Sequence, residues 1–245
     1  MSQFQEVSNW IGVHQPVRIT VLTGAGISAE SGIPTFRGQD GLWKDYSAEQ
    51  LATPQAFARN PQLVWEWYEW RRDIIRTARP NAAHAALARL EQAIGSNFTL
   101  ITQNVDGLHA AARSNRILEL HGNIFRVRCT VEGRVLPQWD PLKTVPPQCE
   151  CGALLRPDVV WFGEALQEPV LAAAAAAVRE AHLFLIIGTS GAVYPAAGLI
   201  SLLRGTSVEI NPESTPMTER CTFSIAQNAV TAVPRVVDMI LGGAQ

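Results

Sequence analysis

The sequence has few cysteines, no long apolar run and almost no excess of charge of either sign. Its 245 residues include 4 cysteines, and 20 Lys and Arg nearly balance 22 Asp and Glu, for a net charge of -2. Four unevenly spaced cysteines are too few for a disulfide framework. The charge balance lacks the basic excess of nucleic-acid-binding proteins. We therefore expect no nucleic-acid partner.

Segments that would direct the chain to a membrane or out of the cell are also lacking. No apolar stretch reaches the roughly 18 residues of a transmembrane helix, and the N-terminus has no basic and apolar leader. We expect a soluble, cytoplasmic protein without a membrane partner. Hydrophobic residues make up 47% of the chain and charged residues 17%. This composition is sufficient for one large core with a smaller appendage.

A glycine-rich turn near the start of the chain carries the first functional signal. Residues 18–23 predict a short β-strand, and a G-x-G-x-x-A pattern that begins at Gly24 follows it. In this pattern Gly24 permits a tight turn and Gly26 lets the backbone approach a pyrophosphate, which would lie at the N-terminus of the next helix. An ordinary strand-to-helix turn is the alternative. Residues 32–34, Gly-Ile-Pro, stop this helix earlier than in a Rossmann turn.

A helix with one buried face is predicted from residue 61 to residue 77. Tyr68 and Arg71 are three residues apart and therefore adjacent on its surface. A phenol and a guanidinium held side by side are suited to binding a carboxylate. The alternative is that Tyr68 only packs and Arg71 is a solvated charge.

Polar residues follow two later predicted strands, 98–102 and 117–120. Gln103, Asn104 and Asp106 come after the first strand and His121 after the second. Ligands of open α/β sheets bind at the carboxyl ends of strands, so these side chains are well placed for a polar small molecule. Among five histidines, His121 is the best candidate for a general base. A polar turn and a structural histidine are the alternatives.

An irregular segment that begins at residue 127 contains three of the four cysteines, Cys129, Cys149 and Cys151. Two C-x-x-C pairs about 15 to 20 residues apart would indicate a zinc ribbon. Here Glu132 takes the place of the second ligand, and the later pair is C-x-C. Zinc held by three cysteines with a carboxylate or water, and a segment without metal, both remain open.

Apolar strands and helices alternate through the rest of the chain. Near-continuous apolar strands between helices predict a parallel, doubly wound sheet. The last helix is expected to begin at Pro234, since proline suits a first helical turn. The other expected elements are a helix at 168–181, a strand at 183–187, a helix at 196–203 and a strand at 207–210.

Six motifs occur in the order seen in sirtuins, the NAD-dependent protein lysine deacylases. The chain resembles this family from about residue 17 to residue 240, and its Tyr68-x-x-Arg71 helix resembles the bacterial desuccinylase and deacetylase branch, class III. The motifs are Gly24-Ala25-Gly26-Ile27-Ser28, Gly32-Ile33-Pro34-Thr35-Phe36-Arg37, Gln103-Asn104-Val105-Asp106, His121-Gly122, Val160-Trp161-Phe162-Gly163-Glu164 and Gly188-Thr189-Ser190.

The resemblance implies an α/β fold in a single catalytic unit, which we expect to be a monomer. A Rossmann-like large part would comprise residues 1–37, 85–125 and 159–245. A small part would comprise a helical insertion, 38–84, and a cysteine-bearing insertion, 126–158. NAD and an acyl-lysine protein or peptide would meet in the cleft between the two parts. The cysteine-bearing insertion would be the place for Zn²⁺.

The resemblance also implies roles for individual residues. His121 would be the general base, and Tyr68 and Arg71 would recognise an acyl carboxylate. Substrate binding would also involve Val160, Phe162, Gly163 and Glu164, with residues 159–164 pairing with the substrate backbone. The zinc ligands would be Cys129, Cys149 and Cys151. NAD would be bound by Gly24, Ala25, Gly26, Ser28, Ile33, Phe36, Arg37, Trp43, Gln103, Asn104, Val105, Asp106, Gly188, Thr189, Ser190, Asn211, Pro212, Glu213 and Ala229.

The implied reaction transfers an acetyl or succinyl group from lysine to ADP-ribose and releases nicotinamide and free lysine. Two other classes share such a pocket, a mono-ADP-ribosyltransferase and a non-catalytic NAD-binding module. The intact His121 and residues 103–106 argue against the second. A hydride-transfer dehydrogenase would want an acidic residue about 20 positions after the glycines. A Pro- and Gly-rich loop occupies that interval.

Overall fold

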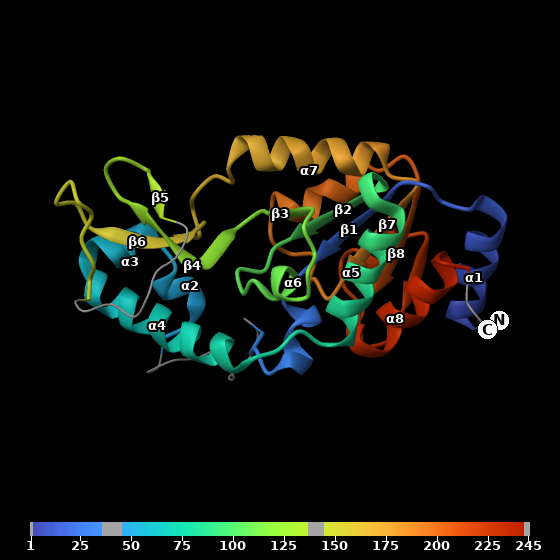
Figure 1. Ribbon diagram of the computed structural model, residues 1–245, viewed down its shortest axis with the longest axis horizontal. Helices are drawn as coiled ribbons and strands as arrows, with labels where there is room; N and C mark the ends of the chain where they lie inside the picture. Colours follow the sequence, from blue (N-terminus) through green and yellow to red (C-terminus); the bar gives the residue numbers. More distant parts are fainter. Residues whose placement is uncertain (1, 36–45, 137–144, 243–245) are drawn as a thin grey trace.

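The computed structural model describes residues 2–35, 46–136 and 145–242. Its main feature is a six-stranded, fully parallel sheet with the strand order β3-β2-β1-β7-β8-β9 (Figure 1). The predicted doubly wound α/β architecture is confirmed. The strands are β1 Ile19–Thr23, β2 Phe98–Thr102, β3 Ile117–Glu119, β7 Leu183–Ile187, β8 Thr206–Ile210 and β9 Phe223–Ile225.

Helices cover both faces of this sheet, which explains why its strands are apolar throughout. Val21 of β1 packs into the core under one face, whereas Leu22 packs under the other. The first face is covered by α1 (Gln3–His14), α5 (Ala82–Ile94) and α8 (Ala229–Ile240), and the second by α7 (Glu168–Glu180) and the 3₁₀ helix η5 (Ala196–Leu202). The sequence had predicted an ordinary helix where η5 lies. One short helix, α6 (Leu108–Ala111), follows β2.

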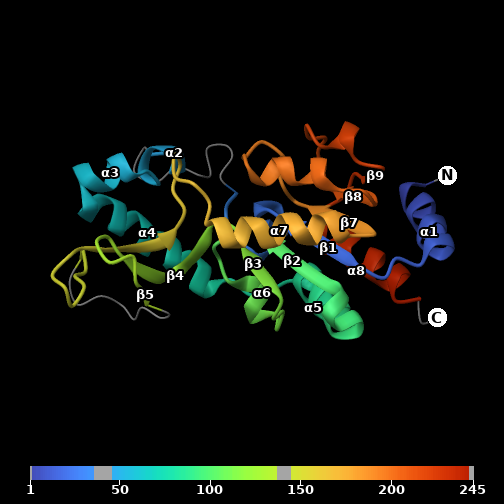
Figure 2. The same cartoon turned by 90° about the horizontal axis from the view of Figure 1, so that it is seen from above.

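A second core lies beside the parallel sheet, at the end of the molecule opposite α1 (Figure 2). It is built from an antiparallel three-stranded sheet of order β5-β4-β6 and three helices. Trp65 joins the two layers, since its indole N–H donates to the carbonyl of Leu155 at 2.9 Å. The elements are α2 Ala48–Leu51, α3 Pro54–Arg59, α4 Pro61–Thr77, β4 Gly122–Cys129, β5 Val135–Leu136 and β6 Leu155–Val159.

Helix α4 has the bounds that its apolar period predicts. Asn60 caps its N-terminus by accepting a hydrogen bond from the backbone N–H of Leu63 at 3.0 Å, and Pro61 occupies the first helical position. Arg72 is fully buried on the packed face and donates to the carbonyl of Ile124 in β4 at 2.7 Å. These contacts fix the helix against the small sheet and thereby place Tyr68 and Arg71.

The segment after β1 differs from its prediction. Instead of an α-helix, two 3₁₀ turns follow, η1 (Ala25–Ile27) and η2 (Ala29–Ser31). The second turn ends at Gly32, which has a left-handed backbone with φ +86°. Pro34 lies two residues further on, so the chain cannot continue as a helix. The predicted phosphate-binding position therefore lies in a turn, and the predicted helix N-terminus is absent there.

The start of the last helix was also predicted wrongly. Helix α8 begins at Ala229, and Pro234 lies inside it. Asn228 supplies the cap, because its side chain accepts a hydrogen bond from the backbone N–H of Thr231 at 3.0 Å. This earlier start places Ala229 in the first turn of α8. In the described part of the chain, no helix has the length and apolar character to cross a membrane.

Candidate active site

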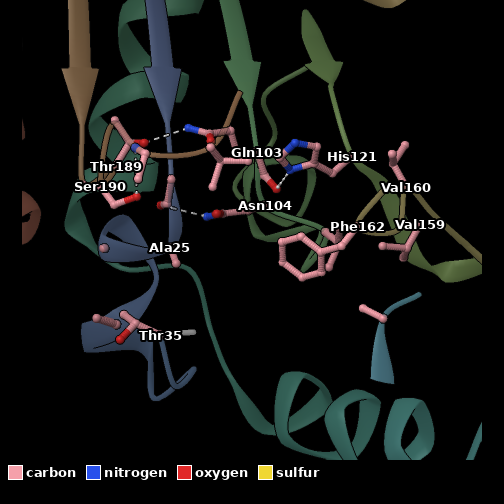
Figure 3. Close-up of a pocket in the computed structure, with 18 of the residues that line it drawn as sticks. Ala25, Thr35, Gln103, Asn104, His121, Val159, Val160, Phe162, Thr189 and Ser190 are labelled. Carbon is pink, nitrogen blue, oxygen red and sulfur yellow. Dashed lines mark hydrogen bonds between the residues drawn. The ribbon is translucent and has the colours of Figure 1, made fainter. Parts of the chain in front are cut away.

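A cavity of about 780 Å³ lies between the carboxyl ends of the parallel strands and the second core (Figure 3). Most of the residues that the sequence predicts for the site line it. Ser28, Ile33 and Asp106 do not, and Phe36, Arg37 and Trp43 lie outside the described residues. The predicted residues in the lining are Gly24, Ala25, Gly26, Tyr68, Arg71, Gln103, Asn104, Val105, His121, Val160, Phe162, Gly163, Glu164, Gly188, Thr189, Ser190, Asn211, Pro212, Glu213 and Ala229.

The glycines of the first turn are required by close packing between two strand ends. Gly24 has an extended backbone with φ −125°, so the left-handed freedom of glycine is not used there. A Cβ on Gly24 would lie 2.8 Å from the carbonyl oxygen of Gly188, and one on Gly26 would lie 2.7 Å from the Cα of Gly188. The turn after β1 therefore fits against the turn after β7 only with glycine at both positions.

Side-chain amides hold the strand ends together around the cavity. Gln103 donates to the hydroxyl of Thr189 at 2.8 Å, which joins the ends of β2 and β7. Asn104 donates to the carbonyl of Gly24 at 3.1 Å, and Asn211 donates to the carbonyl of Thr189 at 2.9 Å. Figure 3 shows the first two of these bonds. Residues far apart in the sequence thus form one polar wall.

Asp106 is buried directly behind this wall, with 7% of its surface exposed. Its carboxylate accepts hydrogen bonds from the hydroxyl of Ser28 at 2.7 Å and from the backbone N–H of Leu108 at 2.8 Å. Burial raises the pKa of Asp106, and the two hydrogen bonds oppose that shift. Ser28 also contacts Asn104, whose amide nitrogen lies 3.2 Å from its hydroxyl. Asp106 and Ser28 therefore support the lining from behind.

His121 has a defined orientation and tautomer. Its Nδ1 lies 2.9 Å from the carbonyl oxygen of Gln103. A carbonyl oxygen can only accept, so the proton belongs on Nδ1 and the lone pair of the neutral ring on Nε2. Burial lowers the pKa of His121, although the bond to Gln103 opposes this shift. The ring is therefore neutral at pH 7, as a general base must be.

Tyr68 and Arg71 line the same cavity from α4. The oxygen of Tyr68 accepts a hydrogen bond from the indole N–H of Trp161 at 2.9 Å. Burial raises the pKa of Tyr68 to about 12, so the phenol keeps its proton. The guanidinium carbon of Arg71 lies 5.1 Å from the ring centroid of Trp67. A hydroxyl and a cation thus face one pocket, as carboxylate recognition requires.

Backbone N–H groups of the segment after β6 already have hydrogen-bond acceptors in the folded chain. The backbone N–H of Val160 donates to the carbonyl of His121, and that of Phe162 to the carbonyl of Ala52, both at 2.9 Å. Glu164 accepts the backbone N–H of Trp161 at 2.8 Å. A substrate backbone that adds to this segment would have to displace one of these bonds or use carbonyl oxygens. The predicted strand pairing remains a prediction.

Sequence reasoning missed several residues in the lining, among them Val193 and Tyr194. Tyr194 is 72% exposed in the loop after β7. An apolar Val-Tyr pair directly before Pro195, in the loop that follows a predicted strand, was the available signal. Trp161 was included in the segment 159–164 that is expected to pair with substrate, but it was given no role of its own.

The cysteine-bearing segment gathers a donor set for a metal. One ligand atom each from Cys129, Glu132, Cys149 and Cys151 lies within 4.8 Å of the others. The sulfurs of Cys129 and Cys151 are 3.5 Å apart. Sulfurs around a tetrahedral zinc with 2.3 Å bonds lie about 3.8 Å apart. The arrangement fits a zinc site whose fourth ligand is the carboxylate of Glu132.

Comparison with known proteins identifies a family and close relatives for this chain. The model of the Sir2 family matches residues 24–195. An NAD-dependent protein deacylase of Aquifex aeolicus is 52% identical over 229 residues, which cover 91% of this chain and 95% of that protein.

Two solved structures share the fold. A Sir2 homologue in complex with NAD has a TM-score of 0.87 and 42% identity and covers 97% of this chain and 92% of its own. A complex of Sir2 with a p53 peptide and NAD⁺ has a TM-score of 0.83 and 31% identity, over 97% of both chains. With this fold, this site and these relatives, the chain belongs to the Sir2 family.

Proposed function

We propose that this chain is an NAD-dependent protein lysine deacylase that removes succinyl and other acidic acyl groups as well as acetyl. One water would be consumed for each acyl group removed, and the products would be nicotinamide, O-acyl-ADP-ribose and free lysine. The observation that carries the proposal is a single cavity lined both by a neutral, oriented His121 and by the pair Tyr68 and Arg71. The first is suited to base catalysis and the second to a carboxylate.

The long polar wall of the cavity supports binding of a dinucleotide. We assign the turn 24–26 and residues 188–190 to the phosphates and adenosine ribose, and residues 211–213 with Ala229 to the adenosine end. Gln103 and Asn104 would hold the nicotinamide ribose. Asp106 would act from its buried position, through its hydrogen bond with Ser28. The likeness to a solved Sir2 homologue in complex with NAD supports NAD as the dinucleotide.

The chemistry assigned to the chain itself is one proton transfer. NAD supplies the ribosyl carbon that receives the acyl oxygen when nicotinamide departs. His121 takes the proton of a ribose hydroxyl on Nε2, while its Nδ1–H stays bonded to Gln103. His121 is half-buried in the lining of the cavity, where a bound substrate would reach its basic nitrogen.

Mass spectrometry of matched acetyl-lysine and succinyl-lysine peptides, with and without NAD, tests the proposal. We expect NAD-dependent loss of succinyl at least as efficient as loss of acetyl, with one nicotinamide released per lysine. Loss of acetyl alone would refute the acidic-acyl specificity and keep the deacylase. NAD binding with no change in either peptide would refute deacylation, and ADP-ribose added to a protein would then identify a transferase.

A further inference from the structure

We propose that Trp161 is a specificity-determining residue that fixes the direction of the Tyr68 hydroxyl proton, an inference that rests on the proposed acidic-acyl specificity. Trp161 and Tyr68 come from different elements, the segment after β6 and helix α4. They meet at the cavity, where the indole N–H donates to the phenolic oxygen at 2.9 Å. We call the part of the cavity formed by Tyr68, Arg71 and Trp161 the acyl pocket.

The hydrogen bond from Trp161 determines what Tyr68 can do next. A phenol can both accept and donate, and an indole N–H can only donate. Because Trp161 occupies an acceptor position on the phenolic oxygen, the O–H of Tyr68 must point elsewhere. Among the described residues, none accepts that proton. Tyr68 is 1% exposed, so the unused donor is held out of bulk water at the edge of the acyl pocket.

Trp161 is held in place on several sides. The guanidinium carbon of Arg156 lies 3.3 Å from its ring centroid, and the ring of Phe57 lies at 5.2 Å. Arg156 forms a two-point ion pair with Glu164, at 2.6 and 2.9 Å. Glu164 in turn accepts the backbone N–H of Trp161 at 2.8 Å. These contacts leave the indole little freedom to rotate, so its N–H is held in one position from which it donates to Tyr68.

Acidic and neutral acyl groups should respond differently to this arrangement. A carboxylate only accepts hydrogen bonds, so it would satisfy the Tyr68 proton while it pairs with Arg71. An acetyl group has no terminal oxygen to offer, and the buried donor would stay unpaired, which is unfavourable. The hydrogen bond from Trp161 thus favours acidic over neutral acyl chains by fixing the direction of the Tyr68 proton.

The test is a double-mutant cycle with Trp161→Phe and Tyr68→Phe, in which kcat/KM is measured on succinyl-lysine and acetyl-lysine peptides. Trp161→Phe removes the N–H and keeps an aromatic ring against Arg156 and Phe57. We expect the succinyl-to-acetyl ratio of kcat/KM to fall about tenfold in each single variant. In the double variant we expect no further fall, because both substitutions remove the action of one hydroxyl.

Phe57→Leu is the matched control, because Phe57 packs on the same ring and offers no polar atom to Tyr68. This variant should change both substrates by the same factor. Equal losses on both substrates in Trp161→Phe, an unchanged ratio, or additive losses in the double variant would each overturn the inference. If Trp161→Phe does not fold, Trp161→Met serves as the second variant.

The wild-type protein separates this inference from the function on which it rests. If it removes acetyl but not succinyl, the proposed specificity and the role of Trp161 both fail. If it removes succinyl and the variants keep the wild-type ratio, only the role of Trp161 fails.

Discussion

A single main-chain oxygen determines the chemical form of His121. The carbonyl of Gln103 can only accept a proton, so it orients the ring and leaves Nε2 as the basic atom. The same strand end thus supplies the polar wall and the partner of the base. The orientation and tautomer of His121 thus depend on a few atoms, and single substitutions can test their role.

His121→Ala should lower kcat about 10² to 10⁴-fold, the usual contribution of a general base. Burial lowers the pKa of His121, so the neutral form persists as the pH falls below its ordinary value of about 6.5. We therefore expect the acid limb of the wild-type kcat profile to have its midpoint below pH 6.5. Steady-state kinetics of nicotinamide release from pH 5 to pH 8.5 would measure the loss of kcat in His121→Ala and the midpoint of the wild-type acid limb. Turnover of His121→Ala near the wild-type rate would exclude the base role.

Arg71→Met should weaken desuccinylation much more than deacetylation, because the substitution keeps an unbranched apolar stem and removes the charge and the N–H donors. A charge-assisted hydrogen bond contributes about 1.5 to 3 kcal/mol, so kcat/KM for a succinyl peptide should fall about 10 to 150-fold. Arg71→Lys keeps the charge without the planar fork and should fall in between. Equal losses on both peptides would make Arg71 a structural residue.

The cysteine-bearing element is small and has little core of its own. Its strands β4 and β5 pair over only two residue pairs, Val127 with Leu136 and Arg128 with Val135. Cys129 and Cys149 are buried and Cys151 is exposed. A metal bound by all three cysteines would stabilise this element by holding its ends together, because short two-stranded pairs are only marginally stable alone.

Purified protein should therefore contain about one zinc per chain, measured by elemental analysis. Glu132→Cys should keep the metal and slow its release to a chelator, since it adds a fourth thiolate, and Glu132→Ala should speed the release. Removal of the metal should lower the melting temperature. A protein that contains no zinc and whose melting temperature does not respond to zinc would show that this element is stable by packing alone.

The folded molecule as a whole holds two histidines in an interior that disfavours their charged forms. The rings of His84 and His109 lie 4.8 Å apart, and His109 Nε2 lies 2.9 Å from the hydroxyl of Thr23. Burial lowers the pKa of His84 to about 4 and that of His109 to about 3. The contacts of these two histidines join α5, α6 and β1. Protonation of either histidine should therefore change the free energy of unfolding of the whole molecule.

Stability should fall as the pH is lowered from about 6.5 towards 4. The folded pKa values lie below the ordinary value of about 6.5, so between these values the unfolded state binds more protons and is favoured. The free energy of unfolding should fall with a slope that approaches about 1.4 kcal/mol per pH unit for each histidine. Urea unfolding at pH 7.5, 6.5 and 5.5 would measure this slope. His84→Gln should flatten the slope, whereas the same change at exposed His14 should not.

The parallel sheet was predictable because its cause is local. Five-residue apolar strands, such as residues 183–187, alternate with amphipathic helices, and that pattern alone requires a sheet buried on both faces. The bounds of α4 followed in the same way from its apolar period. The start of α8 was not found, since proline at a first helical turn and asparagine as a cap compete, and only the packing of the helix decides between them.

The sequence alone determined which chemistry this protein carries: a general base after a strand, amides at strand ends, a phenol beside a guanidinium and three thiols near a carboxylate. Each of these rests on residue type and spacing. Tertiary structure decided what they can do together. It showed that Gly24 and Gly26 allow the close approach of Gly188, that Trp161 donates a hydrogen bond to Tyr68, and that Glu132 lies beside the cysteines. Such contacts join residues as many as 164 positions apart, so no local pattern encodes them.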